Sequence, residues 1–140
     1  MRQAPDDFSN ISFVDLMLAN FKRLPQFKTK NGDIAHKKPD GSDWSIAEWT
    51  NAMAGEVGEA CNVAKKIRRG DYDGDIELAR RLLLSEIADV VIYADLICQQ
   101  LNASLGDAVR QTFNEKSLKL RIDVQISSRA ERVSEFLGGK

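Results

Sequence analysis

Residues 45–69 read SIAEWTNAMAGEVGEACNVAKKIRR, and residues 76–101 read IELARRLLLSEIADVVIYADLICQQL. The first stretch begins with Ser45 and Glu48, the pattern of a capping box, and a glycine follows it as a C-cap. The second stretch is apolar almost all round, so we expect a helix that is buried on most sides. Because only the short loop at 70–75 separates the two stretches, they predict an antiparallel helical hairpin.

Further segments complete the predicted fold around this hairpin. Ser12 and Asp15 form another capping-box pattern, and Pro25 ends the helix that they begin. The polar stretch before the hairpin contains Asn-Gly and Pro-Asp-Gly turns, which predict a long loop. We predict helices at 12–24 and 104–120, a loop at 26–43, and a short helix after Ser128 and Glu131.

These patterns predict an all-α fold, an antiparallel bundle of about four main helices. The chain of 140 residues has the length of one domain. We therefore predict a single domain over residues 1–140, with a core at about 42–120 and a C-terminal extension at 121–140.

The composition argues against several classes of protein. The chain has 20 Lys and Arg, 21 Asp and Glu, and a net charge of -1, so it gives no reason to expect binding to a nucleic-acid polymer. Two cysteines cannot form a disulfide framework, and one histidine excludes a site with several histidine ligands. The first residues lack a signal-peptide pattern, and acids interrupt the longest apolar stretch. We expect a cytoplasmic protein that does not associate with a membrane.

Two acidic pairs interrupt the hairpin helices at the same spacing. Glu56 and Glu59 lie in the first helix, and Glu86 and Asp89 lie in the second. Residues three positions apart share one helix face and lie about one turn from each other. A hairpin folded about its short loop places Glu56 level with Asp89, and Glu59 level with Glu86. The sequence therefore predicts four carboxylates in one layer.

Such a layer needs compensation of its charge. Two charges about 4 Å apart repel by about 4 kcal/mol at an effective dielectric constant of about 20. Oxygen ligands suit hard cations, so we predict bound Mg²⁺, or Mn²⁺ in its place. The other interpretation is that the acids lie on the surface and pair with lysines and arginines of the hairpin. Glu86 and Asp89 favour the metal, because they lie inside an apolar run where acids are rare.

The same residues resemble the MazG-like family of all-α nucleoside triphosphate pyrophosphohydrolases. The pattern that carries the resemblance is ExxE followed by ExxD, here Glu56-Val57-Gly58-Glu59 and Glu86-Ile87-Ala88-Asp89. The surrounding sequence is similar over SDWSIAEWTNAMAGEVGEACNVAKKI, LLSEIADVVIYADLICQQLN and FNEKS. The resemblance covers about residues 42–120 of the chain.

The resemblance implies an enzyme that uses Mg²⁺ to hydrolyse an NTP or dNTP to a monophosphate and pyrophosphate, in house-cleaning of the nucleotide pool. The four acids would be its metal ligands and catalytic residues, and one of them would activate the attacking water. Asn114 in FNEKS matches an asparagine that contacts the nucleotide in this family. Lys116 matches basic residues that contact phosphate, although on an ideal helix it lies about 200° from Asn114.

Five more side chains are candidates for binding the substrate. Tyr93 falls between the two acids of its helix, and its hydroxyl needs a polar partner. Trp44 and Trp49 either stack on a base, as aromatics near this position do in relatives specific for pyrimidine nucleotides, or pack together as a hydrophobic staple. Lys66 either contacts phosphate or complements the helix dipole. His36 either contacts the nucleotide or is an ordinary loop residue.

The sequence leaves more than one possibility open for the oligomeric state and for the class of function. The chain offers few other helices to cover the apolar helix at 76–101, so we expect a homodimer or homotetramer. The alternative to an enzyme is a non-catalytic oligomerisation or regulatory module, whose acids pair with Arg or Lys across an interface. A carboxylate-bridged di-iron bundle is disfavoured, because neither acidic pair contains the histidine of the Glu-x-x-His motif.

Overall fold

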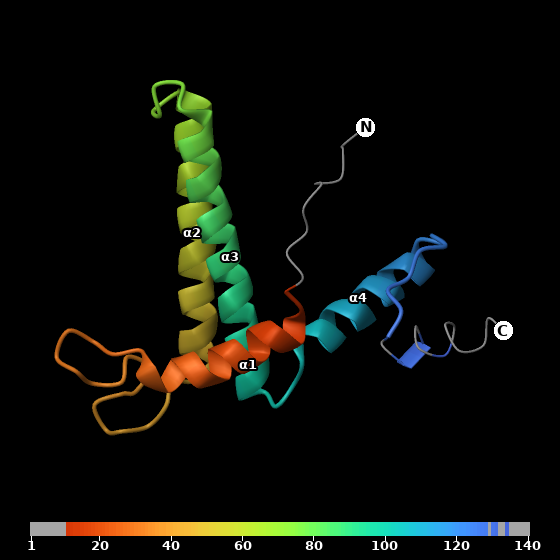
Figure 1. The fold of residues 1–140 in the computed structure, drawn as a ribbon, viewed down its shortest axis with the longest axis horizontal. Coiled ribbons are helices and arrows are strands. Elements are labelled where there is room, and N and C mark those ends of the chain that lie inside the picture. Colours follow the sequence, from red (N-terminus) through yellow and green to blue (C-terminus); the bar gives the residue numbers. More distant parts are fainter. Residues whose placement is uncertain (1–10, 129, 132–133, 135–140) are drawn as a thin grey trace. The chain divides into compact units, whose positions relative to one another are not determined.

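The structure is a computed structural model, and it describes residues 11–128, 130, 131 and 134. The described chain contains α1 (Phe13–Arg23), the short 3₁₀ helix η1 (Leu24–Gln26), α2 (Ile46–Arg69), α3 (Ile76–Gln100) and α4 (Leu105–Lys119) (Figure 1). The predicted all-α class and its four main helices are therefore confirmed. The chain divides into two compact units, Met1–Asn102 and Ala103–Lys140. Among the described residues, no helix has the length and apolar character needed to cross a membrane.

The helices α2 and α3 form the predicted hairpin and pack along each other (Figure 1). Gly70 ends α2 in the left-handed conformation, with φ 79°, which glycine adopts without strain. Asp75 precedes α3, and its carboxylate accepts a hydrogen bond from the Leu78 N–H at 2.9 Å. Because the loop between these caps is short, the helices run antiparallel, as predicted.

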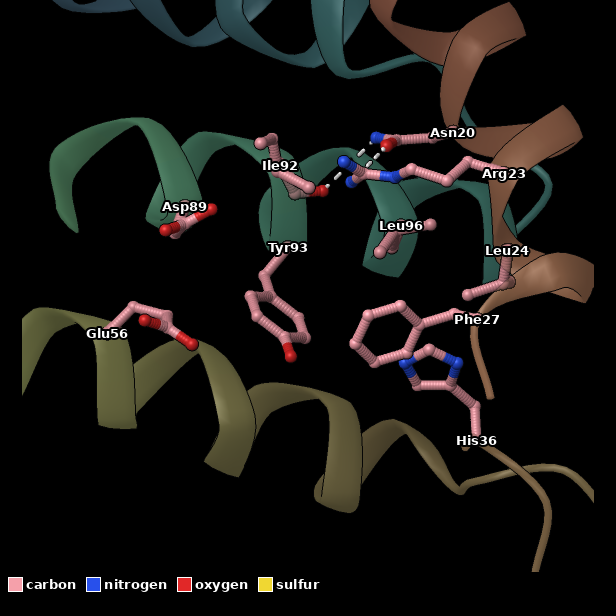
Figure 2. A pocket seen from close by; sticks show the side chains of 10 residues that line it. All are labelled: Asn20, Arg23, Leu24, Phe27, His36, Glu56, Asp89, Ile92, Tyr93 and Leu96. Atoms are coloured by element: carbon pink, nitrogen blue, oxygen red, sulfur yellow. Dashed lines mark hydrogen bonds between the residues drawn. The ribbon is translucent and has the colours of Figure 1, made fainter. Parts of the chain in front are cut away.

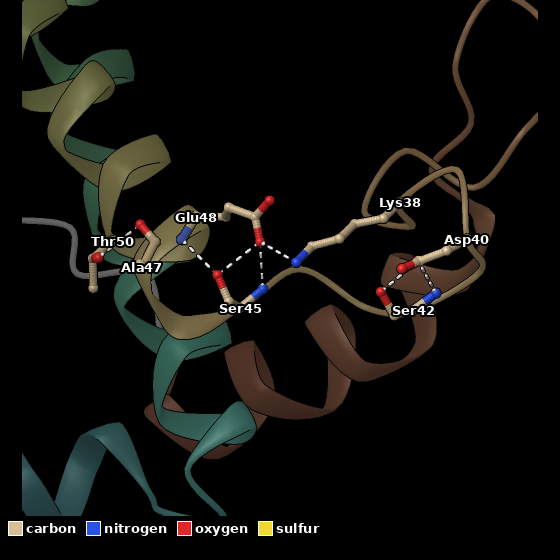
Figure 3. Close-up of polar contacts among 7 residues, drawn as sticks. All are labelled: Lys38, Asp40, Ser42, Ser45, Ala47, Glu48 and Thr50. Carbon is tan, nitrogen blue, oxygen red and sulfur yellow. Dashed lines mark hydrogen bonds and ion pairs between the residues drawn. The ribbon is translucent and has the colours of Figure 1, made fainter.

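The start of α2 is fixed by the predicted capping box, which also holds the preceding loop. Glu48 accepts hydrogen bonds from the N–H and the hydroxyl of Ser45, both at 2.7 Å (Figure 3). Nζ of Lys38, from the loop, lies 3.0 Å from the same carboxylate. These contacts, with the Ser45 hydroxyl the largest cause, lower the pKa of Glu48 to about 2. Glu48 is therefore ionised at neutral pH and ties the loop to the helix.

The predicted loop between α1 and α2 folds back on itself at two places. Isolated β-bridges pair Lys28 with Ile34, and Lys37 with Asp43. An ion pair of 2.7 Å between Lys37 and Asp43 closes the second of these turns. The turns hold His36 in a buried position, 7% exposed, so this loop contributes to the core.

The core of the first unit lies between α3 and the elements that pack on it. Its buried apolar side chains are Trp49, Val63, Ala79 and Leu96. The helix α1 packs on α3, and this contact includes buried polar side chains, Asn20 and Asp95. The three helices of this unit are therefore held together by both apolar and polar contacts.

The single chain covers α3 less completely than its sequence predicts. Leu84, Ile87 and Val91 are 53%, 47% and 40% exposed. The prediction that this helix is buried on most sides is therefore wrong for one copy of the chain. The physical reason is that only α2 and α1 pack on α3 within the first unit.

The second unit contains α4 and the segment that follows it. Ser104 caps α4, and its hydroxyl accepts a hydrogen bond from the Asp107 N–H at 3.2 Å. Further along, Ser128 and Glu131 exchange the hydrogen bonds of the predicted capping box. Most of the short helix predicted after them lies outside the described residues.

Candidate metal centre

Three of the four predicted carboxylates come together between α2 and α3. Glu56, Glu86 and Asp89 each offer one carboxylate oxygen, and these oxygens lie within 4.8 Å of one another. Figure 2 shows Glu56 on α2 facing Asp89 on α3. All three residues are partly exposed, so a ligand can reach them from solvent. We call these three residues the acid group. Their proximity agrees with the predicted register of the hairpin, which places Glu56 level with Asp89.

Glu59, the fourth predicted acid, is exposed and is not a member of the acid group. Its charge still acts on Glu56. Burial raises the pKa of Glu56, and the charges of Asp89, Glu59 and Glu86 raise it further, in that order. Glu59 is therefore a neighbour of the group, and its role as a metal ligand remains a prediction.

The described residues supply no cation that pairs with these acids. Their ion pairs include none of the four predicted carboxylates. Like charges at this spacing raise the free energy of the folded state unless something neutralises them. The interpretation of the acids as paired surface residues therefore finds no support in this part of the chain.

The donor set of the acid group fits a hard divalent cation. Every donor is a carboxylate oxygen, the ligand type that Mg²⁺ and Mn²⁺ prefer. Mg²⁺ binds oxygen at about 2.1 Å, so two of its ligands lie at most about 4.2 Å apart. Rotation of partly exposed side chains brings oxygens within 4.8 Å to that separation. The residues present therefore fit a magnesium or manganese ion.

A cavity of about 260 Å³ adjoins the acid group. Glu56 and Asp89 form one side of its wall, and Tyr93, Phe27 and His36 form another (Figure 2). Burial raises the pKa of the Tyr93 hydroxyl, and the charges of Glu56 and Asp89 raise it further. The hydroxyl is therefore protonated at neutral pH and can donate a hydrogen bond. The cavity thus combines an acidic side with an aromatic side.

The aromatic side is a stack of rings centred on His36. The centroid of its ring lies 4.6 Å from that of Trp49 and 5.4 Å from that of Phe27, and both pairs are stacked. Trp44 meets the His36 ring edge-on at 5.0 Å. Burial lowers the pKa of His36, so its ring is neutral at pH 7. Of this stack, Phe27 and His36 line the cavity, and the two tryptophans pack against His36 outside its wall.

The two tryptophans form the predicted hydrophobic staple. The centroids of Trp44 and Trp49 are 5.2 Å apart, on either side of the capping residue Ser45. Trp49 is only 1% exposed, so packing accounts for most of its surface. Nε1 of Trp49 and Nδ1 of His36 are nevertheless buried without a hydrogen-bond partner among the described residues. Stacking of either tryptophan on a base remains a prediction.

Besides Trp44 and Trp49, which are not part of its wall, three more predicted binding residues do not line this cavity. Lys66 is exposed and is not part of the cavity wall. Asn114 and Lys116 belong to the second unit. There the Asn114 amide donates to the Ile126 carbonyl at 3.1 Å and accepts from the Ile126 N–H at 2.8 Å. Contacts of these three residues with a nucleotide remain predictions.

The cavity wall also includes residues that were not predicted from the sequence. Asn20 and Arg23 reach it from α1, and Phe27 reaches it from the following loop. One signal was present in the sequence. Asn20 lies two turns after Phe13 on the apolar face of its helix, and a polar residue on an apolar face indicates a buried partner.

Comparisons of the chain with protein-family models, with curated proteins and with solved structures give no match. The resemblance to the MazG-like family therefore rests on the residues quoted above. The acid group is the part of that resemblance that the geometry supports.

Proposed function

We propose that this protein uses Mg²⁺ or Mn²⁺ to hydrolyse nucleoside triphosphates to a monophosphate and pyrophosphate, as house-cleaning of the nucleotide pool. The observation that carries the proposal is the acid group, Glu56, Glu86 and Asp89. Its oxygens lie within 4.8 Å of one another beside a cavity with an aromatic side. The ExxE and ExxD pattern of the MazG-like family supports the same assignment.

The reaction adds water across the anhydride between the α and β phosphates. The water oxygen bonds to one of the two phosphorus atoms while the bond from that phosphorus to the bridging oxygen breaks, and the bridging oxygen leaves with the other phosphate. One proton of the water ends on the products, and the other is released to solvent. When bound, a divalent cation would neutralise charge on the phosphate oxygens and make water more acidic. One of the carboxylates would orient the attacking water and accept its proton.

The aromatic side of the cavity suits the nucleoside. Tyr93 offers a hydroxyl donor next to the acids, and His36 offers a neutral ring beside Trp44 and Trp49. We propose that the base or sugar contacts Tyr93 and His36, which line the cavity, while the phosphates face the acids. Contact of the base with Trp44 or Trp49, which do not line the cavity, is a further prediction. Further proposed contacts, to the nucleotide and its phosphates, come from Asn114, Lys66 and Lys116.

Release of pyrophosphate and monophosphate tests the proposal. The panel should contain dCTP, dUTP, dTTP and the purine nucleotides, each with Mg²⁺, with Mn²⁺ and with EDTA. We expect cation-dependent turnover of at least one nucleotide, with the two products formed in equal amounts. If no nucleotide yields a monophosphate with either cation, the proposal is wrong.

Variants of the acids test the site. We expect Glu56→Gln to lower kcat about 100-fold or more, because a metal ligand is lost. Glu77→Gln is the matched control, since Glu77 is an exposed acid in the first turn of α3 and lies outside the cavity. Full activity of Glu59→Gln would remove Glu59 from the site without affecting the other assignments.

We also propose that the protein is a homodimer or homotetramer. The support is the exposed apolar surface of α3, where Leu84, Ile87 and Val91 lack cover from their own chain. A second copy that covers this surface would remove it from water. Light scattering tests the assembly, and a monomeric mass would refute it.

A further inference from the structure

Arg23 is the only lysine or arginine among the described residues that line the cavity. In Figure 2 its side chain reaches from α1 towards Ile92 of α3. His36, the other basic side chain of the wall, is neutral, because burial lowers its pKa. The cavity therefore offers one permanent positive charge on the same wall as two carboxylates, Glu56 and Asp89.

Asn20 holds the guanidinium of Arg23. Nη2 of Arg23 donates a hydrogen bond to Oδ1 of Asn20 at 3.1 Å. Asn20 is 2% exposed, and its Nδ2 donates to the Asp95 carboxylate at 2.8 Å. Because only the amide nitrogen can donate to a carboxylate, the amide oxygen faces the other way, towards Arg23. Asp95 thereby fixes the orientation of the Asn20 amide, whose oxygen accepts the hydrogen bond from Arg23.

Asp95 is itself held in place. It is 1% exposed, and the oxygen that accepts from Asn20 also accepts from Nε2 of Gln99 at 2.7 Å. Gln99 donates a second hydrogen bond to the Met17 carbonyl at 3.2 Å. Buried polar groups with matched donors and acceptors are rigid. The buried contact between Asn20 and Asp95 is therefore preorganised, and it presents the amide oxygen to the exposed Arg23.

Arg23 keeps donors for a further partner. A guanidinium carries several N–H donors in one plane, and among the described residues only Asn20 accepts from it. No carboxylate of the described chain lies within ion-pair distance of Arg23. Its charge acts on the cavity, because it opposes the rise in the pKa of Tyr93. A planar fork of donors matches the oxygens of a phosphate group.

We infer that Arg23 binds phosphate oxygens of an anionic ligand in this cavity, and that Asn20 and Asp95 are positioning residues that act through it. The inference rests on the proposed function, in which this ligand is a nucleoside triphosphate. In this arrangement the acids of α2 and α3 would bind the divalent cation, and Arg23 of α1 would bind the phosphate oxygens of the nucleotide.

Binding of inorganic tripolyphosphate in the presence of Mg²⁺ tests this inference without requiring turnover. We expect Arg23→Ala to weaken binding, measured by isothermal titration calorimetry, about 10- to 100-fold, because charge-assisted hydrogen bonds are lost. Arg23→Lys should recover only part of the affinity, since an ammonium lacks the planar fork.

Arg68→Ala is the matched control for charge. Arg68 is an exposed arginine near the end of α2 and does not line the cavity, so this variant should bind tripolyphosphate as the unmodified protein does. Equal affinities of Arg23→Ala and Arg68→Ala would overturn the inference. Absence of tripolyphosphate binding by the unmodified protein would also overturn it.

A double-mutant cycle tests the positioning role of Asn20. If Asn20 acts through Arg23, the double variant Asn20→Ala/Arg23→Ala binds tripolyphosphate no more weakly than Arg23→Ala alone. If the losses of affinity in the two single variants add up in the double variant, Asn20 acts independently of Arg23, and its positioning role is overturned. Circular dichroism confirms that each variant is folded, and the Arg23 variants alone test the phosphate contact.

The failure of this inference differs from the failure of the proposed function. Tripolyphosphate binding that depends on Arg23, in a protein that releases no pyrophosphate, would remove only the proposed enzyme activity. Turnover with the same kcat/KM in Arg23→Ala and Arg68→Ala would remove only the role of Arg23.

Discussion

Asp89 and Asp95 lie on one helix, less than two turns apart, in opposite surroundings. Asp95 is 1% exposed and accepts hydrogen bonds from the amides of Asn20 and Gln99. Asp89 is partly exposed and lies among other acids, with no paired cation in the described chain. The protein itself stabilises the first carboxylate and leaves the charge of the second for a ligand. Burial of an acid therefore marks a structural role here, and partial exposure without a partner marks the site.

The largest effect is expected from Asp95→Ala. The substitution removes one acceptor from each of two amides, the buried Asn20 and the part-buried Gln99, and each lost hydrogen bond costs about 1–3 kcal/mol. We expect the free energy of unfolding, measured with urea, to fall by about 2–5 kcal/mol. Asp95→Asn is the matched variant, because its side-chain oxygen can keep both hydrogen bonds. Equal losses in the two variants would contradict this account.

Asp89→Asn should give the opposite pattern. We expect kcat/KM for the best nucleotide to fall about 100-fold or more, because a metal ligand is weakened. The melting temperature in EDTA should stay within about 2 °C of the unmodified protein, since Asp89 makes no hydrogen bond that holds the fold. A large drop in melting temperature with activity retained would reverse the comparison between the two aspartates.

Addition of Mg²⁺ should stabilise the protein through the acid group alone. A ligand at about 100 times its Kd adds about 2.7 kcal/mol to the free energy of unfolding. For a chain of this length we expect a rise in melting temperature of about 5 °C or more by differential scanning fluorimetry. Asp89→Asn should lose this rise and Asp95→Asn should keep it. A rise of the same size with NaCl at matched ionic strength would show screening instead of binding.

His36 is a buried titratable group that, unlike Asp95, lacks full compensation by the protein. Its Nδ1 has no hydrogen-bond partner among the described residues. Burial lowers its pKa from 6.5, so below about pH 6.5 the unfolded chain takes up a proton before the folded chain does. Stability contributed by the neutral ring is therefore complete above that pH and is lost as the pH falls. We expect the melting temperature to fall by about 2 °C between pH 7 and pH 5.5.

His36→Phe tests the source of this pH dependence. Because His36 is the only histidine of the chain, the variant should lose most of the change between pH 7 and pH 5.5. The substitution keeps an aromatic ring against Trp49 and Phe27. An unchanged pH dependence in the variant would assign the effect to carboxylates.

The acid group could be predicted from the sequence because its geometry is local. A short loop fixes the register of α2 against α3, so the spacing of Glu56 from Glu86 and Asp89 follows from helix geometry. The two capping boxes that begin α1 and α2 were predictable for the same reason, since each involves residues three positions apart.

The contribution of α1 could not be predicted in this way. A long loop separates Arg23 from α2, and no spacing rule relates the two ends of such a loop. On an ideal helix Asp95 lies on the face of α3 away from Glu86, and it is not a member of the acid group. A polar residue on the apolar face of α1 indicates a buried partner for Asn20, but no spacing rule identifies that partner as Asp95 or links it to Arg23.

The loop that joins α2 and α3 has a practical consequence for handling the molecule. Along the helix axis it lies about 16 Å from Glu59, at the tip of the hairpin. A fluorescent or affinity tag inserted at Asp73 would therefore sit clear of the acids. A thiol-reactive dye would instead reach the exposed Cys61, two residues from Glu59. The protein can thus be immobilised by its hairpin tip with the acids left open to solvent.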